Sequence, residues 1–313
     1  MIITILGLGK MGRRIAKKLL ASGYHIIVWN RSEQAIADFI KELSLQEKKQ
    51  ISIISTINEI TKPLTSPRLI WSMLPAGDVT QGVLEKVFSL VTKGDIVVDG
   101  GNTHYQESQK WFETFAQKKV RFLGIGISGG ILASKNGFAL MAGGDKSAYE
   151  IILPILQTLA KPFGNVAYVG AGGAGHFVKM VHNGIEYGMM QSLGEGFGVL
   201  EKSPYQLNLA QIAKIYCKGT IISGFLTDRV ADVLTKDSDL SRIDGVIDAS
   251  GEAAWTIEAA KKEHVPVPII KKSLTFREAS QKDPKVIASF AAKLIAAIRH
   301  EFGGHKIVSK ESK

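Results

Sequence analysis

A run near the middle of the chain, residues 172–195, combines side chains that transfer protons and bind polar ligands. Residues three, four, seven and eight apart share one face of a helix. One such face would carry Lys179, His182, Asn183, Glu186 and Tyr187. We expect the opposite stripe to supply the apolar contacts of this helix, through Val178, Val181, Ile185 and Met189 with Ser192 near them. The polar face is then predicted to line a cleft; a solvated helix surface is the alternative.

The same stretch is rich in glycine, which is unusual in a helix. A glycine in a helix interior destabilises the helix by about 1 kcal/mol relative to alanine. Glycines nevertheless precede the predicted helix, interrupt it and follow it: Gly172, Gly173, Gly175, Gly184, Gly188, Gly194, Gly196 and Gly198. We infer that another backbone or a ligand packs closely against this helix.

The composition bounds the class of protein. With 313 residues and 45% apolar content, the chain can form two ordinary hydrophobic cores. No apolar run reaches the roughly 18 residues of a membrane span, and the first residues lack the basic region of a signal peptide. The single Cys217 excludes an internal disulfide and a cysteine-based metal cluster. We therefore expect a cytoplasmic protein that uses no membrane.

The formal net charge is +10, so nucleic acid has to be considered as a partner. The basic residues are spread over many predicted helices, and no basic patch interleaved with aromatic residues is present. We expect no nucleic-acid partner, and part of the excess charge fits a site for an anionic small molecule.

A glycine-rich turn opens the chain. A short apolar run at 2–6 predicts a strand, and a helical pattern follows up to Gly23. Between them lies G-x-G-x-x-G, made of Gly7, Leu8, Gly9, Lys10, Met11 and Gly12. In a strand–turn–helix context the first glycine makes the turn, the second admits a pyrophosphate and the third lets the helix pack. A second strand at 26–29 completes the pattern, which predicts a dinucleotide-binding site.

The end of the second strand indicates which dinucleotide binds. An NAD site usually has an acidic residue here for the ribose 2′-hydroxyl, and the sequence has Asn30, Arg31 and Ser32 instead. Arg31 could meet a 2′-phosphate, with Asn30 and Ser32 as hydrogen-bond partners. NADP is therefore the expected cofactor. NAD remains possible if Arg31 stacks on the adenine or faces water.

Strand and helix patterns then alternate, with further strands predicted at 51–54, 68–74, 95–99, 120–123, 138–142 and 166–169. This alternation predicts a doubly wound, mostly parallel sheet of the Rossmann type, in which ligands lie beyond the carboxyl ends of the strands. Three loops rich in glycine and small polar residues fall there, at 73–77, 99–103 and 126–130. We expect Met73, Leu74, Pro75 and Asn102 to contact the cofactor.

From Gly172 onward the chain reads as helices without a clear strand pattern. Further helices are predicted at 209–218, 225–234, 254–262, 269–281 and 285–302. The predicted architecture is an N-terminal dinucleotide-binding domain at 1–171 followed by an all-α domain for substrate binding and dimerisation at 172–313.

At this point the chain resembles a known family. Its motifs are GLGKMG at 7–12, DGGNT at 99–103, GISGG at 126–130, GHFVKMVHNGIEYG at 175–188, FR at 276–277 and RHEFGGH at 299–305. They are similar to those of decarboxylating 6-phosphogluconate dehydrogenases of the short form, within the wider β-hydroxyacid dehydrogenase family. The helix motif is the most specific of them, and the resemblance covers essentially the whole chain.

The resemblance implies an activity and a set of roles. The family oxidises 6-phospho-D-gluconate at C3 and releases CO2 to give ribulose 5-phosphate, a step of the pentose phosphate pathway that needs no metal. Lys179 would be the base, Glu186 the acid that protonates C1, and Asn183 would hold the C3 oxygen. Substrate would be bound by Asn102, Ser128, Gly129, Gly130, His182, Tyr187, Arg277, Arg299 and His305. In this family the tail residues come from a second subunit, so a homo-oligomer, at least a dimer, is expected.

One segment departs from the family pattern. Longer members carry a phosphate-binding lysine just before the residue matching Trp255, and residues 248–255 contain no cation here. Two alternatives therefore stay open. The chain could act on a small 3-hydroxy acid without decarboxylation, or it could be a non-catalytic NADP-binding protein; the pairing of Lys179 with Glu186 argues against the second.

Overall fold

The computed structural model describes residues 2–60, 66–249 and 251–309, and the chain forms two compact units, Met1–Met180 and Val181–Lys313. The division falls inside the long helix α8 (Ala174–Glu201), further along the chain than the predicted boundary at 171. Among the described residues no helix is long and apolar enough to cross a membrane.

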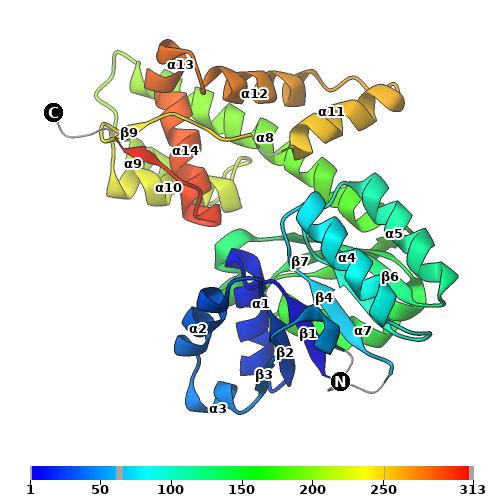
Figure 1. Cartoon of the computed structure of the whole chain (residues 1–313). Helices are drawn as coiled ribbons and strands as arrows, with labels where there is room; N and C mark the ends of the chain where they lie inside the picture. Colours follow the sequence, from blue (N-terminus) through cyan, green and yellow to red (C-terminus); the bar gives the residue numbers. More distant parts are fainter. Residues whose placement is uncertain (1, 61–65, 250, 310–313) are drawn as a thin grey trace. The chain divides into compact units, whose positions relative to one another are not determined.

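The first unit is built on one eight-stranded sheet with helices on both faces (Figure 1). Its strands are β1 (Ile3–Leu6), β2 (Ile26–Trp29), β3 (Ile51–Ile53), β4 (Leu69–Ser72), β5 (Ile96–Asp99), β6 (Arg121–Ser128), β7 (Ala139–Gly144) and β8 (Val166–Gly170). They are arranged in the order β3-β2-β1-β4-β5-β6-β7-β8. All neighbours pair in parallel except β6 and β7, which confirms the prediction of a mostly parallel doubly wound sheet.

The strands alternate between two cores because successive side chains point to opposite faces of a sheet. On one face Ile3 and Ile5 pack with α1 (Lys10–Ala21), α2 (Glu33–Lys41) and α7 (Lys146–Ala160). On the other face Leu6 and Ile70 pack with α4 (Asp78–Leu90) and α5 (Tyr105–Gln117). Short helices α3 (Leu45–Lys48), η1 (Ile57–Glu59), η2 (Gly130–Leu132) and α6 (Ala133–Asn136) complete the unit.

The second unit is helical, as predicted. Besides the end of α8 it contains α9 (Leu209–Tyr216), α10 (Phe225–Lys236), α11 (Glu252–Lys262), α12 (Pro268–Ala279), α13 (Pro284–Ala288) and α14 (Phe290–Gly303). The predicted helix at 285–302 is in fact two helices, because Ser289 leaves the helical conformation and caps α14 by accepting a hydrogen bond from the Ala292 N–H at 3.2 Å. A small antiparallel pair, β9 (Ile243–Asp244) with β10 (Val308–Ser309), is the one exception to the all-α prediction among the described residues.

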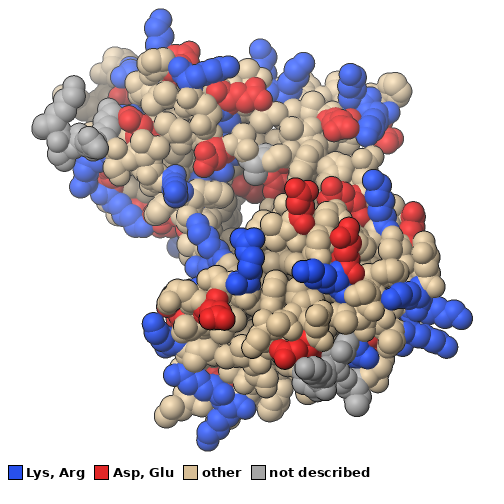
Figure 2. Space-filling view, in the orientation of Figure 1, with Lys and Arg blue, Asp and Glu red and all other residues tan. Residues whose placement is uncertain are grey.

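The visible face of the molecule carries charges of both signs. Figure 2 shows Lys and Arg side chains interspersed with Asp and Glu over the visible face, without a continuous basic surface.

Candidate active site

The glycine turn after β1 has the geometry that a dinucleotide needs. Gly7 has a positive φ of 104°, and a Cβ added at Gly12 would lie 2.0 Å from the Gly7 carbonyl oxygen. Around Gly9, which begins α1 without a side-chain cap, an added Cβ would meet nothing within 4 Å. The turn therefore presents a helix N-terminus and open backbone to an anion, and these residues fit a pyrophosphate.

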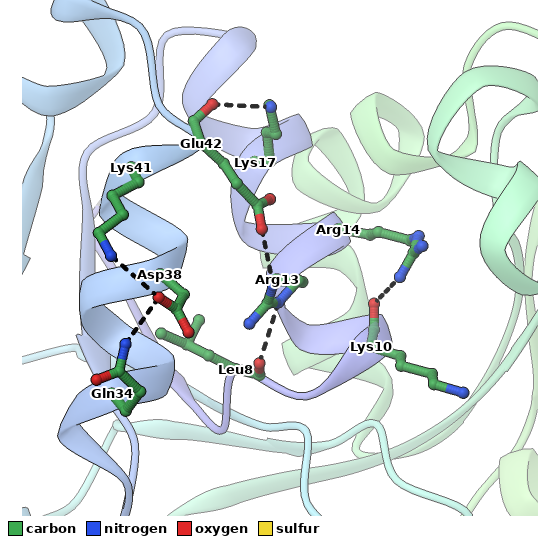
Figure 3. Close-up of polar contacts among 9 residues, drawn as sticks. All are labelled: Leu8, Lys10, Arg13, Arg14, Lys17, Gln34, Asp38, Lys41 and Glu42. Carbon is green, nitrogen blue, oxygen red and sulfur yellow. Dashed lines mark hydrogen bonds and ion pairs between the residues drawn. The ribbon is translucent and has the colours of Figure 1, made fainter. Parts of the chain in front are cut away.

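Figure 3 shows how the basic side chains of α1 are used. Arg13 pairs with Glu42 at 2.7 Å and its Nε donates to the Leu8 carbonyl at 3.4 Å. Arg14 donates to the Lys10 carbonyl at 2.5 Å. The Lys17 ammonium donates to the Glu42 carbonyl at 3.0 Å. These contacts support the fold around the turn.

The three residues expected at the ribose have unequal freedom. Asn30 accepts from the Leu8 N–H at 2.9 Å and donates to the Ser32 carbonyl at 3.1 Å, so its side chain holds the glycine turn. Ser32 caps α2 by accepting from the Ala35 N–H at 3.4 Å. Arg31 is exposed between them. Of the three, Arg31 is thus the one whose side chain is available to a 2′-phosphate.

The loops at 73–77 and 99–103 touch. A Cβ added at Gly101 would lie 2.6 Å from the Leu74 carbonyl oxygen, and one at Gly100 would lie 2.7 Å from the Met73 sulfur. The buried Asp99 carboxylate holds the second loop by accepting from the Gly101 N–H at 3.0 Å and the Thr103 hydroxyl at 2.5 Å. This contact brings Met73 and Leu74 next to the loop that carries Asn102, while Pro75 lies exposed in the same turn.

The Lys179 side chain packs against Gly126, in the motif at 126–130. A Cβ at Gly126 would lie only 2.3 Å from the Lys179 Cβ. One turn earlier, Gly175 lies so close to the sheet that an added Cβ would be 2.1 Å from the Gly124 carbonyl oxygen. Gly126 belongs to β6, which ends at Ser128 and is followed by Gly129 and Gly130, both with positive φ. The motif at 126–130 therefore positions the lysine stem as well as providing a polar loop.

In the second unit α8 carries the remaining polar residues. The His182 Nδ1 lies 3.0 Å from the Asn183 Oδ1 and 3.9 Å from the Glu186 Oε2. Tyr187 is buried, and the Arg277 guanidinium stacks 3.2 Å from the centre of its ring. These residues come from α8 and α12, two helices of the same unit.

Two arginines are buried together here. Arg277 and Arg299 are 2% and 5% exposed, and neither Nη1 nor Nη2 of Arg277 has a hydrogen-bond partner among the described residues. Burial lowers the pKa of Arg277 to about 10, and Arg299 contributes further by charge repulsion, while Tyr187 and Glu186 oppose the shift. Burial also lowers the pKa of Arg299. Arg277 remains cationic at neutral pH, so the pair forms a buried positive centre.

The segment that departs from the family pattern supplies negative charge instead. Asp248 and Glu252 raise the pKa of Arg299, against the larger effect of burial. Glu252 is itself buried. Ser250 of this segment lies outside the described residues. The missing lysine is therefore not replaced by another cation from the described part of this loop.

The C-terminal residues fold back on their own chain. The His300 Nδ1 donates to the His305 carbonyl at 2.7 Å, and the His305 ring crowds Gly303. Arg299 is buried in the same unit as Tyr187. His305 is half-buried and lies two residues beyond the end of α14.

The stripe that was expected to supply the apolar contacts of α8 does not pack within the chain, so that prediction is wrong for the single chain. Val178, Ile185 and Met189 are 37%, 53% and 54% exposed, whereas Lys179, Asn183 and Tyr187 are buried. The glycines of α8 explain the difference, since Gly184, Gly188 and Gly194 bring Thr256, Ile269 and Ile295 close to the helix. Close packing at these glycines is confirmed, but among these three the expected backbone neighbour occurs only at Gly194, near the Ala291 carbonyl oxygen, while Gly184 and Gly188 face side chains and an added Cβ at Gly196 would meet nothing.

A groove of about 680 Å³ in the first unit was not anticipated from sequence. It is lined by Tyr105, Gln109, Lys110, Val169, Phe177 and Val178, among others. None of the predicted site residues lines it. Among the described residues, no group of His, Cys, Asp or Glu side chains is arranged to hold a metal ion.

The mostly parallel sheet and the glycine turn after β1 define a Rossmann-type dinucleotide-binding protein. Two family models match the chain: the NAD-binding domain of 6-phosphogluconate dehydrogenase at residues 2–170, and the C-terminal domain of 6-phosphogluconate dehydrogenase at residues 175–299. The chain belongs to the 6-phosphogluconate dehydrogenase family.

Individual relatives agree with this family assignment. The NAD(+)-dependent, decarboxylating 6-phosphogluconate dehydrogenase of Haloferax volcanii is 32% identical, and the match covers 98% of each chain. The NADP(+)-dependent, decarboxylating enzyme of Bacillus subtilis is 35% identical over 92% of this chain and 63% of its own. Among solved structures, Plasmodium falciparum 6-phosphogluconate dehydrogenase has a TM-score of 0.81 at 29% identity, covering 90% of this chain and 62% of its own. This chain therefore spans the full length of some relatives and about two thirds of others.

Proposed function

We propose that this protein catalyses the oxidative decarboxylation of 6-phospho-D-gluconate to D-ribulose 5-phosphate and CO2, with reduction of a nicotinamide dinucleotide. The observation that carries the proposal is the buried pair Arg277 and Arg299 beside Tyr187. Two buried cations suit a phosphate dianion, since paired guanidinium groups bind phosphate by charge-assisted hydrogen bonds, and both Nη groups of Arg277 lack a partner among the described residues. A small 3-hydroxy acid without a phosphate would bring no dianion to these two guanidinium groups.

The chemistry divides among residues of this chain. A nicotinamide dinucleotide held by the glycine turn at 7–12 would supply the hydride acceptor for the oxidation at C3. Lys179, which is buried at Gly126, would take the C3 hydroxyl proton as the general base. Asn183 and His182 would hold the C3 oxygen as it becomes a carbonyl, which then withdraws electrons as the bond to CO2 breaks. Glu186 would return a proton to C1 of the resulting enediol.

Other groups would bind and orient. Asn102 and the Ser128, Gly129 and Gly130 segment would hold the carboxylate end of the substrate. Tyr187, Arg277, Arg299 and His305 would hold the phosphate. The glycine turn with Leu8, Lys10, Met11 and the neighbouring Met73, Leu74 and Pro75 would hold the cofactor. Arg31 favours NADP over NAD because a 2′-phosphate adds charge where the chain offers a guanidinium.

We further propose a homodimer in the cytoplasm. The stripe formed by Val178, Ile185, Met189 and Val199 is exposed on α8, and it repeats with the spacing of one helix face. A second copy of the chain would cover it. The family resemblance implies that the tail residues complete the site of the partner subunit, and we keep this arrangement for His305. Arg299, however, is buried beside Tyr187 of its own chain. We therefore propose that Arg299 binds the substrate of its own chain.

The experiment follows reduced cofactor by absorbance and CO2 by release, with 6-phosphogluconate and either NADP or NAD. One CO2 per reduced cofactor is expected, with the higher kcat/KM for NADP. Reduced cofactor without CO2 would point to a simple hydroxy acid oxidation. Absence of both products with either cofactor would overturn the proposal.

A further inference from the structure

His176 is a buried histidine to which the proposed mechanism gives no role. It is the third residue of α8, one turn before Lys179, and it is 2% exposed. A Cβ added at Gly124 would lie 3.0 Å from its Nδ1 and 2.3 Å from the Ser108 hydroxyl. His176 and Lys179 thus rest on Gly124 and Gly126, two neighbouring positions on the same face of β6.

The other neighbours of the ring belong to the loop at 99–103. The Asp99 carboxylate and the main chain of Asp99 and Gly101 favour the protonated ring, but burial outweighs them and lowers the pKa of His176. The ring is therefore neutral, with one nitrogen as donor and the other as acceptor. Carbonyl oxygens of the loop suit the donor, and the Ser108 hydroxyl suits the acceptor.

The ring's surroundings leave its hydrogen bonds incompletely formed. Neither ring nitrogen nor the Ser108 hydroxyl meets hydrogen-bond geometry with any described residue. Unmade bonds of buried polar groups are costly, so the main chain of Asp99 and Gly101, which interacts with the ring, ties the loop to α8 through His176. The loop carries Asn102, and the helix turn on which the ring stands carries Lys179.

We propose that His176 is a positioning residue, whose neutral imidazole spaces the loop at 99–103 against the turn of α8 that carries Lys179. The inference rests on the proposed function, in which Asn102 and Lys179 act on one substrate. Loss of the His176 imidazole would displace Lys179 and Asn102 relative to each other without removing either side chain. A displacement of about 1 Å can reduce a rate by about a hundredfold.

The test compares His176→Leu, His176→Asn and His176→Gln with wild type, using 6-phosphogluconate with hydrogen or deuterium at C3. We expect His176→Leu to lower kcat by roughly 10- to 100-fold while NADP affinity, measured by fluorescence titration, stays within about twofold. The isotope effect on kcat should rise, because hydride transfer becomes slower than product release. One of the two amides, which reproduces the donor of Nδ1 or Nε2, should recover at least about tenfold of the loss.

The control is Ile125→Val, a buried change on the same strand, which should lower the melting temperature without raising the isotope effect. His176→Leu with kcat within about twofold of wild type would overturn the inference. If His176→Leu does not fold, His176→Asn and His176→Gln provide the test. An isotope effect that equals the wild-type value in both variants, whatever their stability, also overturns the inference. An inactive wild type would instead refute the proposed function.

Discussion

At the scale of single residues, the proposed base and the proposed phosphate ligands are held by different physical means. Lys179 is positioned by the absence of a side chain, since only glycine at 126 leaves room for its Cβ. Arg277 is positioned by stacking on Tyr187, which uses the face of the guanidinium and leaves its edge for an anion. The close contact at Gly126 fixes the position of the Lys179 side chain, and the contact with Tyr187 fixes the orientation of the Arg277 N–H donors.

Replacing Lys179 by alanine should remove the base. We expect kcat with 6-phosphogluconate to fall by about 10²- to 10⁴-fold, since general base catalysis contributes about that much. NADP affinity in a fluorescence titration should not change. Lys202→Ala, at an exposed lysine just beyond α8, is the matched control and should retain full activity. Near-normal turnover of Lys179→Ala would assign the base to another group.

Replacing Arg31 by aspartate should reverse the cofactor preference. The change removes a donor to the 2′-phosphate and places a carboxylate where a ribose 2′-hydroxyl can bind. We expect the ratio of kcat/KM for NADP to that for NAD to fall by about 10- to 100-fold, the loss of a hydrogen bond to a charged group. Lys41→Asp makes the same charge change at the other end of α2 and should leave the ratio unaltered. An unaltered ratio in Arg31→Asp would mean that the arginine does not meet the cofactor.

At the scale of elements, the sequence predicted the features that depend on neighbouring residues, namely the strands and the glycine turn. The strands were found because buried parallel strands read as apolar runs, and the glycine turn because its conformation restricts residue type. The break between α13 and α14 was missed because Ser289 is an ordinary residue whose capping role appears only once the chain turns there. Asn30 was expected to bind ligand, and its contact with Leu8 spans a separation that no local pattern reports.

The prediction of which face of α8 is buried was also wrong, because burial depends on contacts with distant parts of the chain. A sequence pattern divides a helix into two faces and does not say which face the rest of the chain covers. Here the glycines decided, because they let neighbouring helices approach the side that carries Asn183 and Tyr187. The face with Ile185 and Met189 was left exposed.

The exposed stripe of α8 gives a prediction about assembly. Ile185→Asp would place a charge in the proposed interface, where desolvation of an unpaired carboxylate is costly. In light scattering after size exclusion, wild type should have twice the chain mass of 34.0 kDa and the variant a larger fraction at 34.0 kDa. Phe163→Asp, at an equally apolar residue that is 84% exposed in the first unit, should remain dimeric. Dimers of undiminished stability in Ile185→Asp would place the interface elsewhere.

At the scale of the whole molecule, the open question is which chain completes each site. Lys179→Ala and Arg299→Met chains can be mixed under exchange conditions, with two different tags to isolate mixed dimers. If Arg299 serves its own chain, a mixed dimer has no intact site and the activity should stay near that of the parents. Recovery to about half of the wild-type rate per mixed dimer would instead show that Arg299 acts on the partner's substrate.

The buried pair Arg277 and Arg299 also has a consequence for handling the protein. Two like charges out of water, with both Nη groups of Arg277 lacking a partner among the described residues, make the fold less stable than its packing alone would give. Any small dianion that enters relieves this strain, and binding to the native state alone raises the free energy of unfolding. The choice of buffer is then a thermodynamic variable: phosphate or sulfate would act as a stabilising additive, and a wash that strips such anions would leave the catalyst in its most fragile form.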